Sequence, residues 1–268
     1  MSFSLSGKTA IVTGAANGVG LAIARHFISE GANVMMADRD EDQLRAEMGD
    51  VAGEDGPARL FSCDLREKLS QANLLSATID AFDRVDILVN ASRQVLATDP
   101  MDDEDDSIEQ LLQQNLMSGF RLSQLIAKRM IKQAEDAEEG EMAGSIVNLS
   151  SIAARRSRPG LMGYSISCAA LDQMTRTMAI ALAPQRIRVN AVAFGSVMSA
   201  SLKNSLKETD DLREDIVAHT PMGRIAPASE VAEAVQFLCS PAANFITGEI
   251  MTVDGGRALL DPVGTAAH

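Results

Sequence analysis

The 268-residue sequence contains no tryptophan, one tyrosine, three cysteines and three histidines. The cysteines are far apart and odd in number, so they give neither a disulfide framework nor the spacing of a zinc site. With so few histidines, a Cys/His metal site is not expected either. We therefore expect no bound metal and a cytoplasmic protein with reduced thiols, which are Cys63, Cys168 and Cys239.

Long apolar runs are also missing. No stretch approaches the roughly 20 apolar residues that a membrane-spanning helix needs, and the N-terminus does not resemble a signal peptide. Gly/Ser linkers and internal repeats are absent as well. We therefore expect no membrane segment and a single domain over residues 1–268.

Basic residues are outnumbered, with 24 Lys and Arg against 37 Asp and Glu and a formal net charge of −13. Seven acids lie within residues 99–109 and five within 135–141, and neither segment contains a basic residue. Without these twelve acids the chain is almost neutral. The two acidic segments are interpreted as solvated loops, or alternatively as a docking surface for a basic partner. Nucleic-acid binding is disfavoured because phosphate neutralisation needs a basic face.

Short apolar runs rich in β-forming residues alternate with helical stretches along the chain. Runs that are apolar on both faces are typical of a parallel sheet covered by helices. The pattern predicts a doubly wound α/β fold with helices on both faces of the sheet. The least regular stretch, 196–222, is polar and lies where a lid over a pocket is expected. The expected strands are 9–13, 33–37, 58–62, 85–89, 145–149, 187–193 and 250–253, and the expected helices include 19–29, 106–133, 163–183 and 229–238.

A glycine loop, TGAANGVG at residues 13–20, connects the first expected strand to the first expected helix. Its glycines allow a tight turn, and the free N–H groups and dipole of the helix start favour a phosphate. Asp38 ends the second expected strand, where a carboxylate binds both ribose hydroxyls of a dinucleotide and repels a 2′-phosphate. This pattern predicts NAD rather than NADP, although the neighbouring Arg39 softens the preference. Asp38 is also a candidate cap for a helix beginning near Asp40.

The sequence resembles the short-chain dehydrogenase/reductase family over residues 7–256. The motifs TGAANGVG, CDL (63–65), DILVN (86–90), RVNAV (188–192), PMGR (221–224) and TGEIMTVDGG (247–256) stand in the family's order and spacing. The resemblance implies a Rossmann fold, a nicotinamide-dependent oxidoreductase with a small-molecule substrate, and a homotetramer or dimer. It also implies that Asp64 contacts the adenine, Asn90 lies near the adenine ribose and Val197 meets the nicotinamide amide. The expected cofactor-binding residues are Gly14, Asn17, Gly18, Val19, Gly20, Asp38, Asp64, Leu65, Asn90 and Val197.

Hydride transfer between a nicotinamide and a carbonyl or alcohol carbon needs a group that exchanges a proton with the substrate oxygen. In the family a tyrosine does this, with a serine thirteen residues earlier and an upstream asparagine. The resemblance implies that Tyr164 is the tyrosine that exchanges the proton, and that Ser151 and Asn115 are the serine and the asparagine that assist it. Tyr164 is the chain's only tyrosine. We therefore expect an NAD-dependent oxidoreductase that interconverts a secondary alcohol and a ketone.

The lysine of the family's YxxxK motif is absent, because Cys168 stands four residues after Tyr164. A free tyrosine has a pKa near ~10, and an ammonium beside it lowers that pKa, whereas a neutral thiol does not. Cys168 is interpreted as a small buried residue, or alternatively as a redox-sensing thiol. This departure favours the alternative that the chain is a catalytically impaired nucleotide-binding or scaffold protein on the same fold.

Two further positions depart from the family pattern. The family's Asn-Ala-Gly reads Ala91-Ser92-Arg93, which places a bulky cation where a glycine lines the cofactor. The family's Pro-Gly reads Phe194-Gly195. Arg93 is interpreted as a surface arginine that pairs with the acidic run 99–106, or alternatively as a compensating positive charge in the site.

Overall fold

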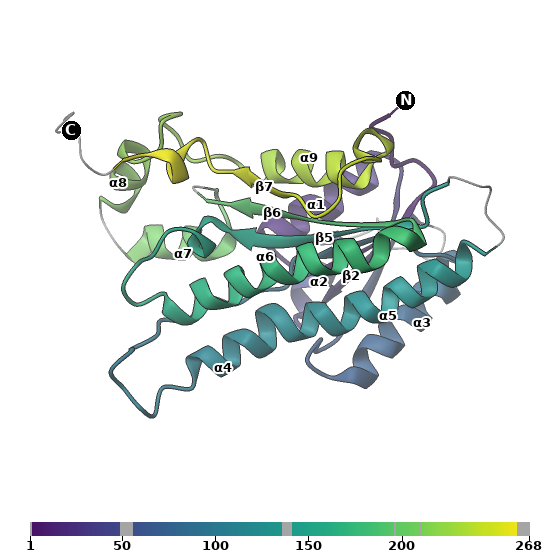
Figure 1. Cartoon of the computed structure of the whole chain (residues 1–268), viewed down its shortest axis with the longest axis horizontal. Helices are drawn as coiled ribbons and strands as arrows, with labels where there is room; N and C mark the ends of the chain where they lie inside the picture. The colour runs from purple at the N-terminus through teal and green to yellow at the C-terminus, as the bar shows by residue number, and fades with distance from the viewer. Residues whose placement is uncertain (1, 49–55, 136–140, 196, 209–210, 262–268) are drawn as a thin grey trace.

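The computed structural model describes residues 2–48, 56–135, 141–195, 197–208 and 211–261. Seven parallel strands form one sheet in the order β3-β2-β1-β4-β5-β6-β7, with helices on both faces (Figure 1). The predicted doubly wound α/β fold is therefore confirmed. The strands are β1 (Thr9–Thr13), β2 (Asn33–Asp38), β3 (Ala58–Ser62), β4 (Ile87–Asn90), β5 (Gly144–Ser151), β6 (Ile187–Phe194) and β7 (Ile250–Val253).

Two apolar cores lie on the two faces of the sheet. Successive strand residues point to opposite faces, so Ile11 belongs to one core and its neighbour Val12 to the other. The first core packs the sheet against α1 (Gly18–Ser29) and α9 (Ala228–Cys239), and α9 lies above the strands in Figure 1. The second packs it against α3 (Lys68–Phe82), α5 (Ser118–Gln133) and α6 (Met162–Leu182).

The strand order reverses at β1, which pairs with β2 on one side and β4 on the other. In open α/β sheets, ligands bind in the crevice outside the carboxyl ends of the strands at such a reversal. The glycine loop follows β1 at this edge, Asn115 follows β4, and Ser151 and Tyr164 lie at the end of β5 and in the helix after it. The fold therefore brings these segments to one edge of the sheet.

Several helices differ from the sequence expectation. The helix expected over 106–133 is α4 (Ser107–Leu112), a π-helical turn (Gln113–Met117) and α5. The expected irregular stretch 196–222 contains two short helices, α7 (Ala200–Glu208) and α8 (Leu212–Ala218). The sequence analysis missed α3, whose buried residues include Gln71 and Thr78 and so give no clear apolar stripe. The chain also forms α2 (Glu41–Met48), close to the helix expected near Asp40.

The structure describes the two acidic segments to different extents. In the 99–109 segment, carboxylates bind backbone N–H groups of their own turns, as when Asp105 accepts hydrogen bonds from the amides of Asp99 and Ser107. The second segment lies mostly outside the described residues. Within the described part of the chain, no helix combines the length and the apolar character needed to cross a bilayer.

Candidate active site

The glycine loop lies tightly against the segment that follows β4. Gly14 has a φ of +64°, and a Cβ there would lie 2.8 Å from the carbonyl oxygen of Ala91 and from the Cα of Ser92. A Cβ on Gly20 would overlap the carbonyl oxygen of Gly14. The first turn of α1 therefore approaches the loop more closely than any side chain allows. The side chain of Asn17 does not cap α1, and the first turn contains no acidic residue, so this helix start suits an anion.

An open, mostly polar cleft lies in front of the glycine loop. Asp38 and Asp64 lie in its wall together with Arg39. The close-packed glycines, the uncapped helix start and the Asp38 carboxylate fit a dinucleotide, whose pyrophosphate and ribose need these groups. The predicted cofactor residues that line this cleft are Gly14, Asn17, Gly18, Val19, Gly20, Asp38, Asp64 and Leu65.

The two carboxylates of this cleft have different partners. Asp38 accepts hydrogen bonds from the amides of Ala16 and Asp40, while Asp40 itself accepts the amide of Gln43 at the start of α2. Asp64 forms a two-pronged salt bridge with Arg66, whose hydrogen bond is the largest of the effects that lower the pKa of that carboxyl. Both carboxylates are therefore held in place, Asp38 by backbone amides and Asp64 by the Arg66 guanidinium.

Two predicted cofactor residues lie away from the cleft wall. Asn90 donates to Ser123 and Asn148, and its amide lines the smaller neighbouring cavity instead. Val197 is buried and forms an isolated bridge with Ala226. Ser199, two residues later, reaches the cleft wall.

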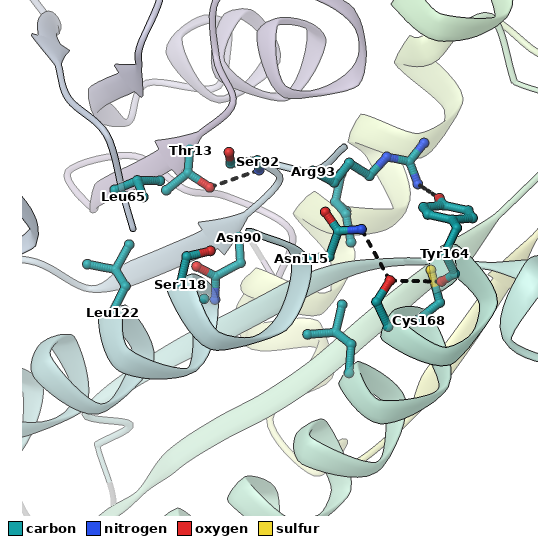
Figure 2. A pocket seen from close by; sticks show the side chains of 14 residues that line it. Thr13, Leu65, Asn90, Ser92, Arg93, Asn115, Ser118, Leu122, Tyr164 and Cys168 are labelled. Carbon is teal, nitrogen blue, oxygen red and sulfur yellow. Dashed lines mark hydrogen bonds between the residues drawn. The ribbon is translucent and has the colours of Figure 1, made fainter. Parts of the chain in front are cut away.

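Tyr164 lies in the first turn of α6 and is buried. Its hydroxyl accepts a hydrogen bond of 2.7 Å from Nη1 of Arg93, which reaches across from the loop after β4 (Figure 2). The Arg93 guanidinium carbon lies 4.1 Å from the ring centroid of Phe194, the last residue of β6. The expectation that Arg93 pairs with the acidic run is therefore wrong: a phenol and an aromatic face hold its guanidinium.

Burial has the largest effect on the pKa values of Tyr164 and Cys168. It raises the pKa of Tyr164, while the Arg93 charge and a hydrogen bond with Ser151 lower it. Burial also raises the pKa of Cys168 to about 11, so its thiol is neutral at physiological pH. Cys168 packs with Leu111 and Tyr164 in a small apolar cluster, which agrees with the interpretation as a buried residue.

Ser151 is the last residue of β5, and its Oγ accepts the amide hydrogen of Ala153. The Ser151 proton therefore remains available to Tyr164 or to a substrate oxygen. Asn115 lies in the π-helical turn, a type of irregularity common at functional sites. Its side chain binds both the N–H and the C=O of Gln94 and also donates to Ser167, whose hydroxyl donates to the carbonyl of Tyr164. Asn115 thus ties the Arg93 loop to the helix that carries the tyrosine.

Comparison with known proteins identifies the family to which this site belongs. A family model described as enoyl-(acyl carrier protein) reductase matches residues 14–258. The 7α-hydroxysteroid dehydrogenase of Escherichia coli K12 is 33% identical over 252 residues, which are 94% of each chain. The 3-oxoacyl-(acyl-carrier-protein) reductase of Thermotoga maritima is 31% identical over 258 residues, covering 95% of this chain and 99% of the relative. The chain belongs to the short-chain dehydrogenase/reductase family.

A solved structure of this family matches the whole fold. It is a 7α-hydroxysteroid dehydrogenase complexed with NADH and 7-oxo glycochenodeoxycholic acid, with a TM-score of 0.86 and 32% identity, and the match covers 95% of this chain and 96% of that one. Together with the sequence relatives, it establishes an oxidoreductase that interconverts an alcohol and a carbonyl with a nicotinamide cofactor.

Sequence reasoning missed several residues of this short-chain dehydrogenase/reductase site. Gln94 and Gln114 line the larger cleft, and Gln114 also donates to Ser92. Both residues belong to segments that follow the end of β4. That position is the feature of the sequence by which they could have been identified as lining the cleft. The direction of the Arg93 side chain had no signal in the sequence, because Tyr164 is 71 residues away along the chain.

Proposed function

We propose that this protein is an NAD-preferring dehydrogenase of secondary alcohols, or reductase of ketones, with Tyr164 as the acid/base. The observation that carries the proposal is the position of the phenol, which lines a cavity directly beside the dinucleotide cleft and lies within reach of Ser151. The bound nicotinamide supplies or accepts the hydride. All proton chemistry then belongs to residues of the chain itself.

The proposed roles follow from the hydrogen-bonding capacity of each group. Tyr164 gives its proton to the carbonyl oxygen during reduction and takes the alcohol proton during oxidation. Ser151 donates to the same oxygen and orients it, because the hydrogen bond that its Oγ accepts from the amide of Ala153 leaves the hydroxyl proton free to donate. Asn115 keeps the loop and helix in register through Gln94 and Ser167. Asn90 likewise holds neighbouring elements together, because its side chain links β4 to β5 through a hydrogen bond with Asn148.

The preference for NAD rests on Asp38. Its carboxylate stands at the end of β2 in the cleft wall, where it accepts ribose hydroxyls and repels a 2′-phosphate. Arg39 lines the same cleft and weakens this discrimination without reversing it. The large exposed side chains of Ile166 and Ile180 on α6 support a homo-oligomer, which sedimentation analysis will test.

The experiment is a survey of secondary alcohols and ketones, including hydroxysteroids, sugar alcohols and acyl thioesters, with NAD(H) and NADP(H). We expect turnover of at least one class with NAD(H), which Tyr164→Phe lowers by about 100-fold or more. Cofactor binding without turnover of any class would instead support the alternative, a nucleotide-binding protein with lost chemistry, which Cys168 in place of lysine favours.

A further inference from the structure

The three positions that depart from the family pattern meet at one point of the structure. Arg93 replaces a glycine, Phe194 replaces a proline, and Cys168 replaces the lysine that follows the tyrosine. In the folded chain the Arg93 guanidinium lies over the Phe194 ring and donates to the Tyr164 hydroxyl. Its charge also acts on the Cys168 thiol.

The guanidinium is fixed from several sides. Phe194 is buried and presents its ring face at 4.1 Å, a favourable position for a cation. The backbone that carries Arg93 is held on one side by Thr13 Oγ1, which accepts the amides of Ala91 and Ser92. On the other side Asn115 holds both backbone groups of Gln94. The donor therefore stays directed at the phenol oxygen.

We propose that Arg93 is the positioning residue that supplies the positive charge beside Tyr164, in place of the lysine that the family carries on the helix. This inference rests on the proposed function of Tyr164 as the acid/base. The cation has moved from helix α6 to the loop after β4, and its guanidinium still reaches the phenol oxygen. Phe194 provides the platform that this relocation requires.

The proton and the hydride of the reaction take separate routes. When the alcohol is oxidised, its proton passes to the phenolate oxygen of Tyr164 and its hydride would pass to the oxidised nicotinamide; reduction reverses both transfers. The guanidinium N–H donates to the tyrosine oxygen in both states and its charge favours the phenolate. Cys168 stays neutral, so no thiolate competes with the phenolate for the guanidinium.

A titration of the cofactor-free protein tests the pairing directly. Because Tyr164 is the only tyrosine, biosynthetic incorporation of a ring-fluorinated tyrosine places one fluorine probe, on a more acidic phenol, at this site alone. Fluorine NMR then gives the ionisation midpoint of residue 164. An opposite charge at this range lowers a pKa by about one to three units, so Arg93→Gln raises the midpoint by that amount.

Two control variants separate the effect of the Arg93 charge from the effect of its side-chain shape and from a change in the net charge of the protein. Arg176→Gln removes the same charge from an exposed position on α6, twelve residues from the tyrosine, and leaves the midpoint unchanged. Arg93→Lys keeps the charge and holds the midpoint within about one unit of the unsubstituted protein. An unchanged midpoint in Arg93→Gln, or equal shifts in Arg93→Gln and Arg93→Lys, overturns the proposal.

Turnover gives the second readout. Cys168→Lys raises the oxidation rate at neutral pH at least tenfold more in an Arg93→Gly background than in the unsubstituted protein, where the cation is already present. Equal gains in both backgrounds refute the relocation of the charge. The titration needs neither cofactor nor substrate, so a failed turnover survey refutes the proposed function and leaves the result for Arg93 standing.

Discussion

The substitution Gly14→Ala tests how the glycine loop supports both the cofactor cleft and the Arg93 loop. Gly14 has a φ of +64°, which costs an alanine about 1–2 kcal/mol. The new Cβ would also lie 2.8 Å from backbone atoms of Ala91 and Ser92. Those residues cannot retreat without losing the hydrogen bonds of their amides to Thr13 Oγ1, at 2.9 and 3.1 Å.

The chain contains a matched control for the free-energy cost of placing an alanine in the left-handed backbone conformation. Gly7 has a similar φ of +73°, but a Cβ there would meet nothing within 4 Å. Gly7→Ala therefore carries only the cost of the left-handed backbone, partly offset by about 0.4–1 kcal/mol from the stiffer unfolded chain. Gly14→Ala carries the same cost and an overpacking cost of about 1–3 kcal/mol as well.

We expect Gly14→Ala to lose about 2–4 kcal/mol of unfolding free energy in urea titrations, against about 1 kcal/mol for Gly7→Ala. Calorimetric titration with NAD will show at least tenfold weaker binding for Gly14→Ala, while Gly7→Ala binds as the unsubstituted protein does. If both variants show the same stability and the same affinity for NAD, the loop is not constrained by Ala91 and Ser92, and the reasoning fails.

Three further predictions follow from the site. Asp38→Asn lowers the ratio of NAD to NADP affinity at least tenfold, since the repulsion of a 2′-phosphate disappears; an unchanged ratio in calorimetry would remove Asp38 from that role. Tyr164→Phe lowers kcat by about 100–10,000-fold with little change in KM, and steady-state kinetics that retain kcat would assign the proton to another group. The folded protein keeps the Cys168 proton up to about pH 11 whereas an unfolded thiol loses it near 9.0, so stability falls as pH rises through this interval. Cys168→Ala makes that decline shallower by about 2 kcal/mol in urea titrations at pH 9 and 11, and equal declines would contradict the burial of the thiol.

Much of the fold could be predicted because parallel strands buried on both faces leave continuous apolar runs. β1, β5 and β6 are buried throughout and lie where the sequence placed them. Helix α3 escaped because polar side chains fill part of its buried face, with Gln71 donating to the carbonyls of Leu65 and Ser118. The break at Gln113–Met117 left no sign, since a π-helical turn needs no particular residue type.

The sequence alone determined the family, the glycine loop and the identity of the phenol, because those features depend on local backbone geometry and on a fixed spacing of motifs. It also showed that a lysine was replaced by Cys168. Only the tertiary structure decided where the replacement charge lies. The guanidinium of Arg93 reaches Tyr164 because the ends of β4 and β6 and the start of α6 meet at one edge of the sheet, where Phe194 supports it. That meeting is set by strand order and packing, which link residues about 70 to 100 positions apart and leave no pattern in the chain itself.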